Sequence, residues 1–262
     1  MRRFAIGAAV SGALALTAVS VPAAQALTPD ISFSNVVVNG GKSITVGTSA
    51  TVEVPVTYTI TRTADVQFDD VSAVVELYRG SSYGTAENFL FPGDVPTCTA
   101  VDDTTQNCTG TIAIDPEIDL YDAKDATTWK SAGVYYRFDD DGYDYIGRTT
   151  SATATLKRAA KVTTNASPEP VKKGATLTVT GSLTRANWAT GSYSGYTSQS
   201  VALQFKAKSS DSYTTVKTVT SGTSGALKTT VTASTDGYWR YSFAGTSTTA
   251  AKNSTGDYVD VQ

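Results

Sequence analysis

The sequence predicts an all-β fold made of two antiparallel β-sandwich domains in tandem. Apolar and polar residues alternate with a period of two through most of the chain, as they do in half-buried strands. Turn residues rich in Gly, Ser and Asp separate these runs, for example at 209–212, 221–225 and 234–237. No segment supplies the helical crossovers that parallel strands need. Short alternating strands with tight turns are typical of antiparallel sandwiches.

The first 26 residues predict a secretory signal peptide. Arg2 and Arg3 precede an apolar or small-residue run over 4–18, and Ala24-Gln25-Ala26 forms an A-x-A cleavage site. We therefore expect cleavage after Ala26 and a secreted, extracellular protein. No second long apolar run follows, so we expect no transmembrane segment.

Residues 27–160 are predicted to form the first domain, which is acidic. Alternating runs predict strands over 52–60 and 71–77 and from 112, and a further strand whose apolar face is Val134, Tyr136 and Phe138. Pro55 cannot donate a ladder hydrogen bond, so its strand is expected at a sheet edge or with a bulge. The segment 119–129 is the only one here that suggests a helical turn.

Cys98 and Cys108 are the only cysteines of the chain. In an oxidising compartment such a pair is expected to form a disulfide across strands or across a loop. The alternative is a metal or redox pair. The spacing is not C-x-x-C and the chain has no histidine, so we favour the structural disulfide.

Residues 161–262 are predicted to form the second domain, which is basic. Its strands are expected around 177–183, 201–207, 227–231, 239–243 and 259–261, with Trp239 in the core. The two halves also share a faint internal repeat, because a glycine opens a similar alternating segment in each, at Gly47 and Gly174. Pro168 and Pro170 stiffen the connecting segment 157–173.

Three segments of the second half carry a resemblance to a known family: GATLTVTGSLTRANW from Gly174, VALQFKAK from Val201, and the stretch from Asp236 to Val261. They resemble an immunoglobulin-like module common in secreted actinobacterial proteins, and residues 27–160 resemble it more weakly through their alternation. The resemblance implies immunoglobulin-like sandwiches and an exported location, but no particular activity. The inter-sheet cysteine pair of antibody domains is missing, so only the general sandwich is implied.

The lack of histidine removes several enzyme classes. Ser-His-Asp and Cys-His catalysis and histidine-ligated zinc all need an imidazole. The sequence also has no Walker loop and no G-x-G-x-x-G motif that enters a helix. We therefore expect no enzyme, but a binding or surface-associated module that contacts cell-wall glycan, an extracellular polymer or another secreted protein.

Two segments are candidate sites. In the loop 185–200, Trp188, Tyr193 and Tyr196 are candidate ligand-binding aromatics, although Trp188 could instead fold back as a plug over the core. An alternative function is calcium binding, for which the candidate metal ligands are Asp139, Asp140, Asp141 and Asp144. The simpler interpretation of the second segment is a hairpin whose turn is Asp141-Gly142.

The net charge differs between the two halves. Residues 27–160 hold 19 acids and 9 bases, for a net −10, whereas residues 161–262 hold 5 acids and 10 bases, for a net +5. The basic half could attract anionic wall polymers, and Lys206 and Lys208 share one strand face. Alternatively, the halves attract each other, or both sets of charges are simply solvated. A sequence pI near 5.0 and export disfavour nucleic acid as a partner.

Overall fold

The computed structural model describes residues 31–64, 68, 71–139 and 142–262. Within these residues there is no α-helix, and the regular elements are β-strands and short 3-10 turns, so the all-β prediction is confirmed. The 3-10 turns are η1 (Asn39–Gly41), η3 (Tyr83–Thr85), η4 (Ala123–Asp125), η5 (Trp188–Thr190) and η6 (Thr223–Gly225). No helix in this part of the chain has the length and apolar character to cross a membrane. The predicted signal peptide lies outside the described residues.

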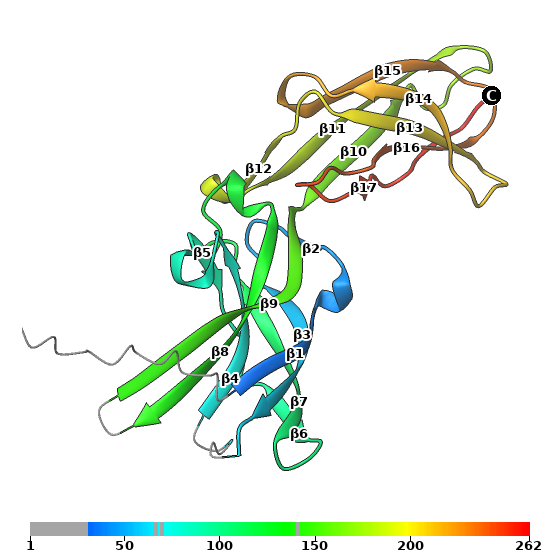
Figure 1. The fold of residues 1–262 in the computed structure, drawn as a ribbon. Helices are drawn as coiled ribbons and strands as arrows, with labels where there is room; N and C mark the ends of the chain where they lie inside the picture. Colours follow the sequence, from blue (N-terminus) through cyan, green and yellow to red (C-terminus); the bar gives the residue numbers. More distant parts are fainter. Residues whose placement is uncertain (1–30, 65–67, 69–70, 140–141) are drawn as a thin grey trace, which may run out of the picture. The chain divides into compact units, whose positions relative to one another are not determined.

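The first half of the chain forms two sheets (Figure 1, blue to green). One sheet has the order β1 (Ile31–Val38), β3 (Val52–Arg62), β7 (Thr105–Ile114) and β6 (Thr97–Ala100). The other has the order β2 (Ile44–Val46), β9 (Gly142–Arg158), β8 (Thr128–Asp139), β4 (Val71–Arg79) and β5 (Asn88–Leu90). Their inner faces enclose a common hydrophobic cluster, which includes Tyr58 and Ile112 of one sheet and Leu77 and Trp129 of the other.

The strand order of this first sandwich is immunoglobulin-like. Immunoglobulin domains place their first, second, fifth and fourth strands in one sheet and the third, sixth and seventh in the other. The same division appears here in β1-β3-β7-β6 and β4-β8-β9. β2 adds to the second sheet by pairing with β9 in parallel, while the other pairs of named strands are antiparallel.

The second half forms another two sheets around its own cluster (Figure 1). In one sheet β11 (Thr176–Asn187) pairs with β10 (Ala160–Ser167), β12 (Ser192–Gly195) and β15 (Ala226–Thr232). In the other, β16 (Gly237–Phe243) pairs with β13 (Ser200–Ala207), β17 (Lys252–Asn253) and β18 (Asp257–Val259), and β14 (Thr214–Thr220) pairs with β13. Trp239 lies in this cluster, as predicted. The division into two domains at residue 160 stays a prediction.

Three local features can be compared with the sequence. The predicted helical turn is present as η4, whose Asp122 and Asp125 form a capping box. The prediction for Pro55 is wrong, because β3 lies between β1 and β7 and carries no bulge of its own. The ladder between β1 and β3 ends at Val56. Pro55 therefore has no partner residue on β1 that would need its missing N–H group.

Cys98 and Cys108 form a disulfide between β6 and β7, at paired positions of neighbouring strands. This confirms the structural disulfide predicted from the sequence. The two cysteines are ten residues apart, and in the chain-entropy model a loop of this size stabilises the fold by about 3 kcal/mol.

Candidate functional site

The outer face of the sheet β4-β8-β9 carries an aromatic groove. Ala73, Val75 and Leu77 of β4 point into the core, so Val74 and Glu76 point to the opposite, outer face. Two adjoining hollows of about 720 and 510 Å³ lie on this face. Both are lined by Phe91 and Tyr136. The first is also lined by Tyr83, Gly84, Ala86, Phe89, Tyr145, Ile146 and Gly147, and the second by Ser72, Val74, Glu76, Pro92, Gly93, Asp94, Val95 and Pro96.

Five aromatic rings form the walls of this groove. Tyr83 meets Phe89 edge-on at a centroid distance of 5.3 Å, and Phe89 stacks on Phe91 at 6.0 Å. Across the β8–β9 pair, Tyr136 and Tyr145 lie 6.0 Å apart. Phe91 is 53% exposed and Tyr145 59%, so two of the rings present large apolar faces to solvent. Contiguous exposed apolar surface of this kind often marks a binding site.

Gly147 on β9 allows Tyr83 to lie against the sheet. A Cβ atom at this position would come within 2.2 Å of the Tyr83 ring. Any other residue would therefore push the ring away and change the wall of the groove.

The buried carboxylate of Glu76 fixes the position of two of these rings, Tyr83 and Tyr136. Its side chain is fully buried, and its two carboxylate oxygens accept hydrogen bonds from the hydroxyls of Tyr83 (2.8 Å) and Tyr136 (2.9 Å). Burial raises the pKa of the Glu76 carboxyl above its usual range, and the two tyrosine hydrogen bonds offset part of that rise. Glu76 is thus a positioning residue of the groove.

Replacing Glu76 by glutamine is expected to remove a pH dependence of stability. The folded protein holds the Glu76 proton more tightly than the unfolded chain, so the native state loses stability as pH rises from the unfolded pKa through the folded pKa. The neutral Glu76→Gln variant lacks this loss. Urea unfolding from pH 4 to 8 should therefore show that the free energy of unfolding of the variant rises relative to that of the native protein across that window. A difference that stays constant or shrinks with pH would contradict the assignment.

The electrostatics of the groove fit a ligand without negative charge. No lysine or arginine occurs among the described residues that line the two hollows, whereas Glu76 and the exposed Asp94 carry carboxyl groups. Asp94 and the Ser72 hydroxyl provide acceptors at the margin of the second hollow. The arrangement offers apolar ring faces flanked by a few polar acceptors, as ligand sites commonly do.

The three aromatic residues of the predicted binding loop pack against two different hydrophobic clusters. Trp188 lies in η5 and is only 5% exposed, and its indole Nε1 donates to the Gly47 carbonyl at 2.8 Å. Tyr193 on β12 also packs against the hydrophobic cluster of the first sandwich, whereas Tyr196 packs on Phe243 of the second. This placement favours the alternative in which Trp188 is a plug. The ligand-binding role of the three aromatics stays a prediction.

The predicted calcium site falls partly outside the described residues, which do not include Asp140 and Asp141. Asp139 ends β8 and Asp144 lies in β9, opposite Arg137. The antiparallel pairing of β8 with β9 extends to Asp139 and Gly142, so the predicted hairpin is confirmed, and Asp141 of its predicted turn lies outside the described residues. In the part of the chain that the structure describes, no three metal-ligating side chains come together. The calcium role stays a prediction.

The aromatic groove was not predicted from the sequence, because the wrong residues of β8 were expected to face the core. Val134 and Tyr136 were expected to face the core, but they belong to the outer cluster, and Tyr135 faces the core instead. The signal was present in the run Val134-Tyr135-Tyr136, which is apolar on both faces. A strand with two apolar faces implies a second surface to be covered or used.

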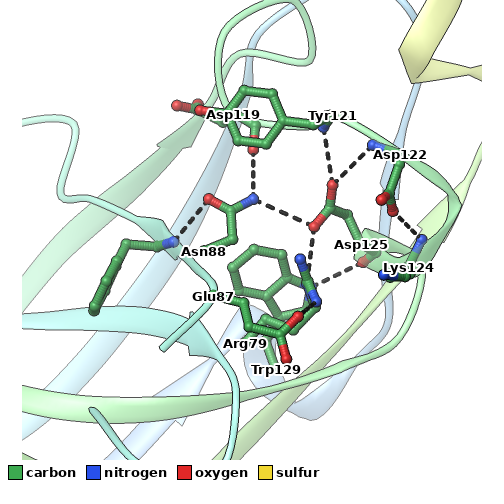
Figure 2. Close-up of polar contacts among 10 residues, drawn as sticks. Arg79, Glu87, Asn88, Asp119, Tyr121, Asp122, Lys124, Asp125 and Trp129 are labelled. Carbon is green, nitrogen blue, oxygen red and sulfur yellow. Dashed lines mark hydrogen bonds and ion pairs between the residues drawn. The ribbon is translucent and has the colours of Figure 1, made fainter. Parts of the chain in front are cut away.

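A buried polar network near the same sheet is a different kind of cluster (Figure 2). The Asp125 carboxylate, fully buried, accepts from Arg79 Nε at 3.0 Å and from Asn88 Nδ2 at 3.2 Å. Its other oxygen accepts from the backbone N–H groups of Tyr121 (2.9 Å) and Asp122 (3.2 Å). Because both carboxylate oxygens are paired within the protein, we assign this network to stability.

No protein-family model matches the sequence, and no curated protein matches it. Among solved structures, the chain is similar to a chimeric titin Z1Z2-Z1Z2 tandem, with 16% identity over 84% of this chain and 95% of that chain and a TM-score of 0.29. It is also similar to the ectodomain of mouse nectin-like molecule 4 (14% identity, 86% and 63% coverage, TM-score 0.25) and to tandem Ig repeats of Dlar (11%, 84% and 93%, 0.22). Scores this low carry no argument, so the immunoglobulin-like assignment rests on the strand order.

Proposed function

We propose that the protein is an exported, non-catalytic binding module whose first sandwich holds a neutral carbohydrate chain in the aromatic groove. The observation that carries this proposal is the pair of adjoining hollows walled by five aromatic rings, with no lysine or arginine among their described lining residues. The target class is cell-wall or other extracellular glycan.

Carbohydrate fits the groove better than other neutral ligands. A pyranose ring has an apolar C–H face and a rim of hydroxyl groups, so it needs both flat apolar surface and hydrogen-bond acceptors. Phe91 and Tyr145 supply the exposed ring faces, and Asp94 supplies acceptors at the margin. The two hollows share Phe91 and Tyr136, so together they suit a chain of sugars rather than a single one.

Export is supported by two features that do not depend on the groove. The N-terminal segment carries the pattern of a signal peptide, and the Cys98–Cys108 disulfide is of a kind that persists in oxidising compartments. A non-catalytic role agrees with the absence of histidine from the sequence and with the engagement of both Glu76 oxygens by tyrosine hydroxyls.

Removing the two exposed rings is expected to abolish most glycan binding. With about 0.5–1.5 kcal/mol for each ring, the range for aromatic pairs, the two losses total about 1–3 kcal/mol, so Phe91→Ala with Tyr145→Ala should weaken binding by about 5- to 150-fold. The measurement is retention of the secreted protein on purified cell-wall glycan, together with titration against neutral oligosaccharides derived from it.

Tyr121→Ala is the matched control, because its ring is 63% exposed but does not line the groove. The control should bind as the native protein does. Equal retention of the control and the double variant, with both folded, would contradict the proposal.

A further inference from the structure

The second sandwich carries a cationic face on the outer side of the sheet β14-β13-β16-β18. Leu203 of β13 and Tyr241 of β16 are buried in the core, so Lys206 and Arg240, on the same strands, point outward. We use the name cationic face for the side chains of Lys206, Lys208, Tyr213, Tyr238, Arg240 and Tyr258.

The cations of this face lie on aromatic rings. The Arg240 guanidinium is 3.8 Å from the centroid of the Tyr213 ring, and its Nε donates to Gln204 at 2.8 Å. The Lys206 ammonium lies between two rings, 5.4 Å from Tyr213 and 4.9 Å from Tyr238. Contacts of this kind hold the long side chains in place, which lowers the entropy lost when they bind a ligand.

Carboxylates do not neutralise the centre of this face. Among the described residues, neither Lys206 nor Arg240 has an acidic partner within 4 Å, and the nearby ion pair is Lys208–Asp236, at 4.0 Å and well exposed. The Asp236 carboxylate also accepts from the Val261 backbone (2.9 Å) and the Tyr258 hydroxyl (3.2 Å). Two ring-held cations therefore face solvent without a counter-charge, on a half of the chain with net charge +5.

Each of the three rings already has a cation over it. Tyr213 has Arg240 and Lys206 over it, Tyr238 has Lys206, and Tyr258 has Lys208 at 5.5 Å. A ligand that binds by laying bases or sugar faces on aromatic rings would have to displace these cations. The groups left for recognition are the N–H donors of guanidinium and ammonium, which pair with phosphate oxygens.

We infer that the cationic face binds a linear phosphodiester polymer, so that the protein has an anion-binding surface distinct from the neutral glycan groove. Repeated phosphates along a flexible chain match cations spread over neighbouring strands, because successive negative charges can contact Lys206, Arg240 and Lys208 in turn. The inference does not depend on the groove, since the two surfaces lie on different sandwiches and select ligands of different charge, one neutral and one anionic.

Binding of the folded, disulfide-bonded protein to fluorescent poly(glycerol phosphate) tests this inference. Lys206→Gln with Arg240→Gln should weaken binding at least tenfold at low salt. It should also lower the slope of log K against log salt by about 1.4, because each phosphate contact contributes about 0.7 for a single-stranded polyanion. The single change Lys206→Gln, which leaves Arg240 on its ring, should lower the slope by about half as much, about 0.7.

Two matched comparisons make the test specific. Lys42→Gln with Lys228→Gln removes the same charge from two exposed positions, one in the first sandwich and one on β15 in the other sheet of the second, and should change binding less than twofold. Phe91→Ala with Tyr145→Ala should leave polymer binding unchanged, which separates this inference from the glycan proposal. Polyglutamate of equal length should bind more weakly than the phosphodiester, and dextran should not compete.

Three results would overturn the inference. One is native affinity in the folded Lys206→Gln, Arg240→Gln variant. Another is an equal loss in the Lys42→Gln, Lys228→Gln control, which would show that only net charge matters. The third is equal affinity for polyglutamate, which would remove phosphate from the assignment.

Discussion

Replacing Asp125 by alanine is expected to destabilise the first sandwich by about 3–5 kcal/mol, as the loss of one partner from a buried charged network does. The Asp125 side chain is fully buried and accepts four N–H groups, two from side chains and two from the backbone of residues 121 and 122 (Figure 2). Alanine leaves these donors without an acceptor in a site that excludes water. The measurement is urea unfolding followed by tryptophan fluorescence, because the backbone carbonyl of Asp125 also accepts from Trp129 Nε1 at 2.9 Å.

Two further variants test whether this loss of stability comes from the buried network or only from the loss of an ion pair with Arg79. Asp125→Asn keeps the shape of the side chain but presents an amide nitrogen to two of the four donors, so we expect an intermediate loss. Glu87 is the second carboxylate partner of Arg79 and is 61% exposed, so Glu87→Ala should cost under about 1 kcal/mol. If Asp125→Ala were no more destabilising than Glu87→Ala, the network would not stabilise the fold as we assign.

The features that the sequence predicted correctly are those that local patterns determine. Alternation placed β3 and β16 as strands and put Trp239 in the core. Two cysteines in an otherwise cysteine-free chain could pair only with each other, and the register shows that they occupy facing positions of β6 and β7. Each of these inferences depends on residues close together in sequence or on a choice with one solution.

The features that the sequence did not reveal depend on contacts between distant segments. Glu76 reaches Tyr136, which is 60 residues further along the chain, and alternation alone does not say which face of β8 is covered. Pro55 looked unsuitable for a central strand because nothing local shows that the ladder with β1 stops at Val56. The groove is therefore a product of strand pairing, which a single sequence does not specify.

The position of Trp188 also depends on a contact between distant segments, and its loss is expected to have the second large effect on stability. Trp188→Ala is expected to destabilise the protein by about 3–5 kcal/mol, the usual range for truncating a buried tryptophan. The indole is almost fully buried in the cluster of the first sandwich although it belongs to a loop of the second, and it bonds to Gly47, which is 141 residues away. The Arg158 guanidinium lies 5.5 Å from its ring, so truncation also removes a contact to this buried cation.

A second variant separates packing from hydrogen bonding at this position. Trp188→Phe keeps much of the apolar volume but leaves the Gly47 carbonyl without its donor, so we expect a smaller loss of about 1–3 kcal/mol. Val216→Ala is the control, because Val216 is apolar but 50% exposed, and its stability should stay within about 0.5 kcal/mol of the native protein. Thermal unfolding of the three variants in one buffer gives the ranking.

The same variants also decide whether Trp188 is a plug or a ligand-binding residue. A plug acts only through stability, so Trp188→Ala at a temperature where it remains folded should keep native retention on cell-wall glycan and native affinity for the phosphodiester polymer. Its unfolding midpoint should nevertheless fall well below that of the native protein. Lost retention with an unchanged midpoint would instead mean that the indole leaves its pocket to contact the ligand. The hydrogen bond to Gly47 and the 5% exposure of Trp188 lead us to expect the first result.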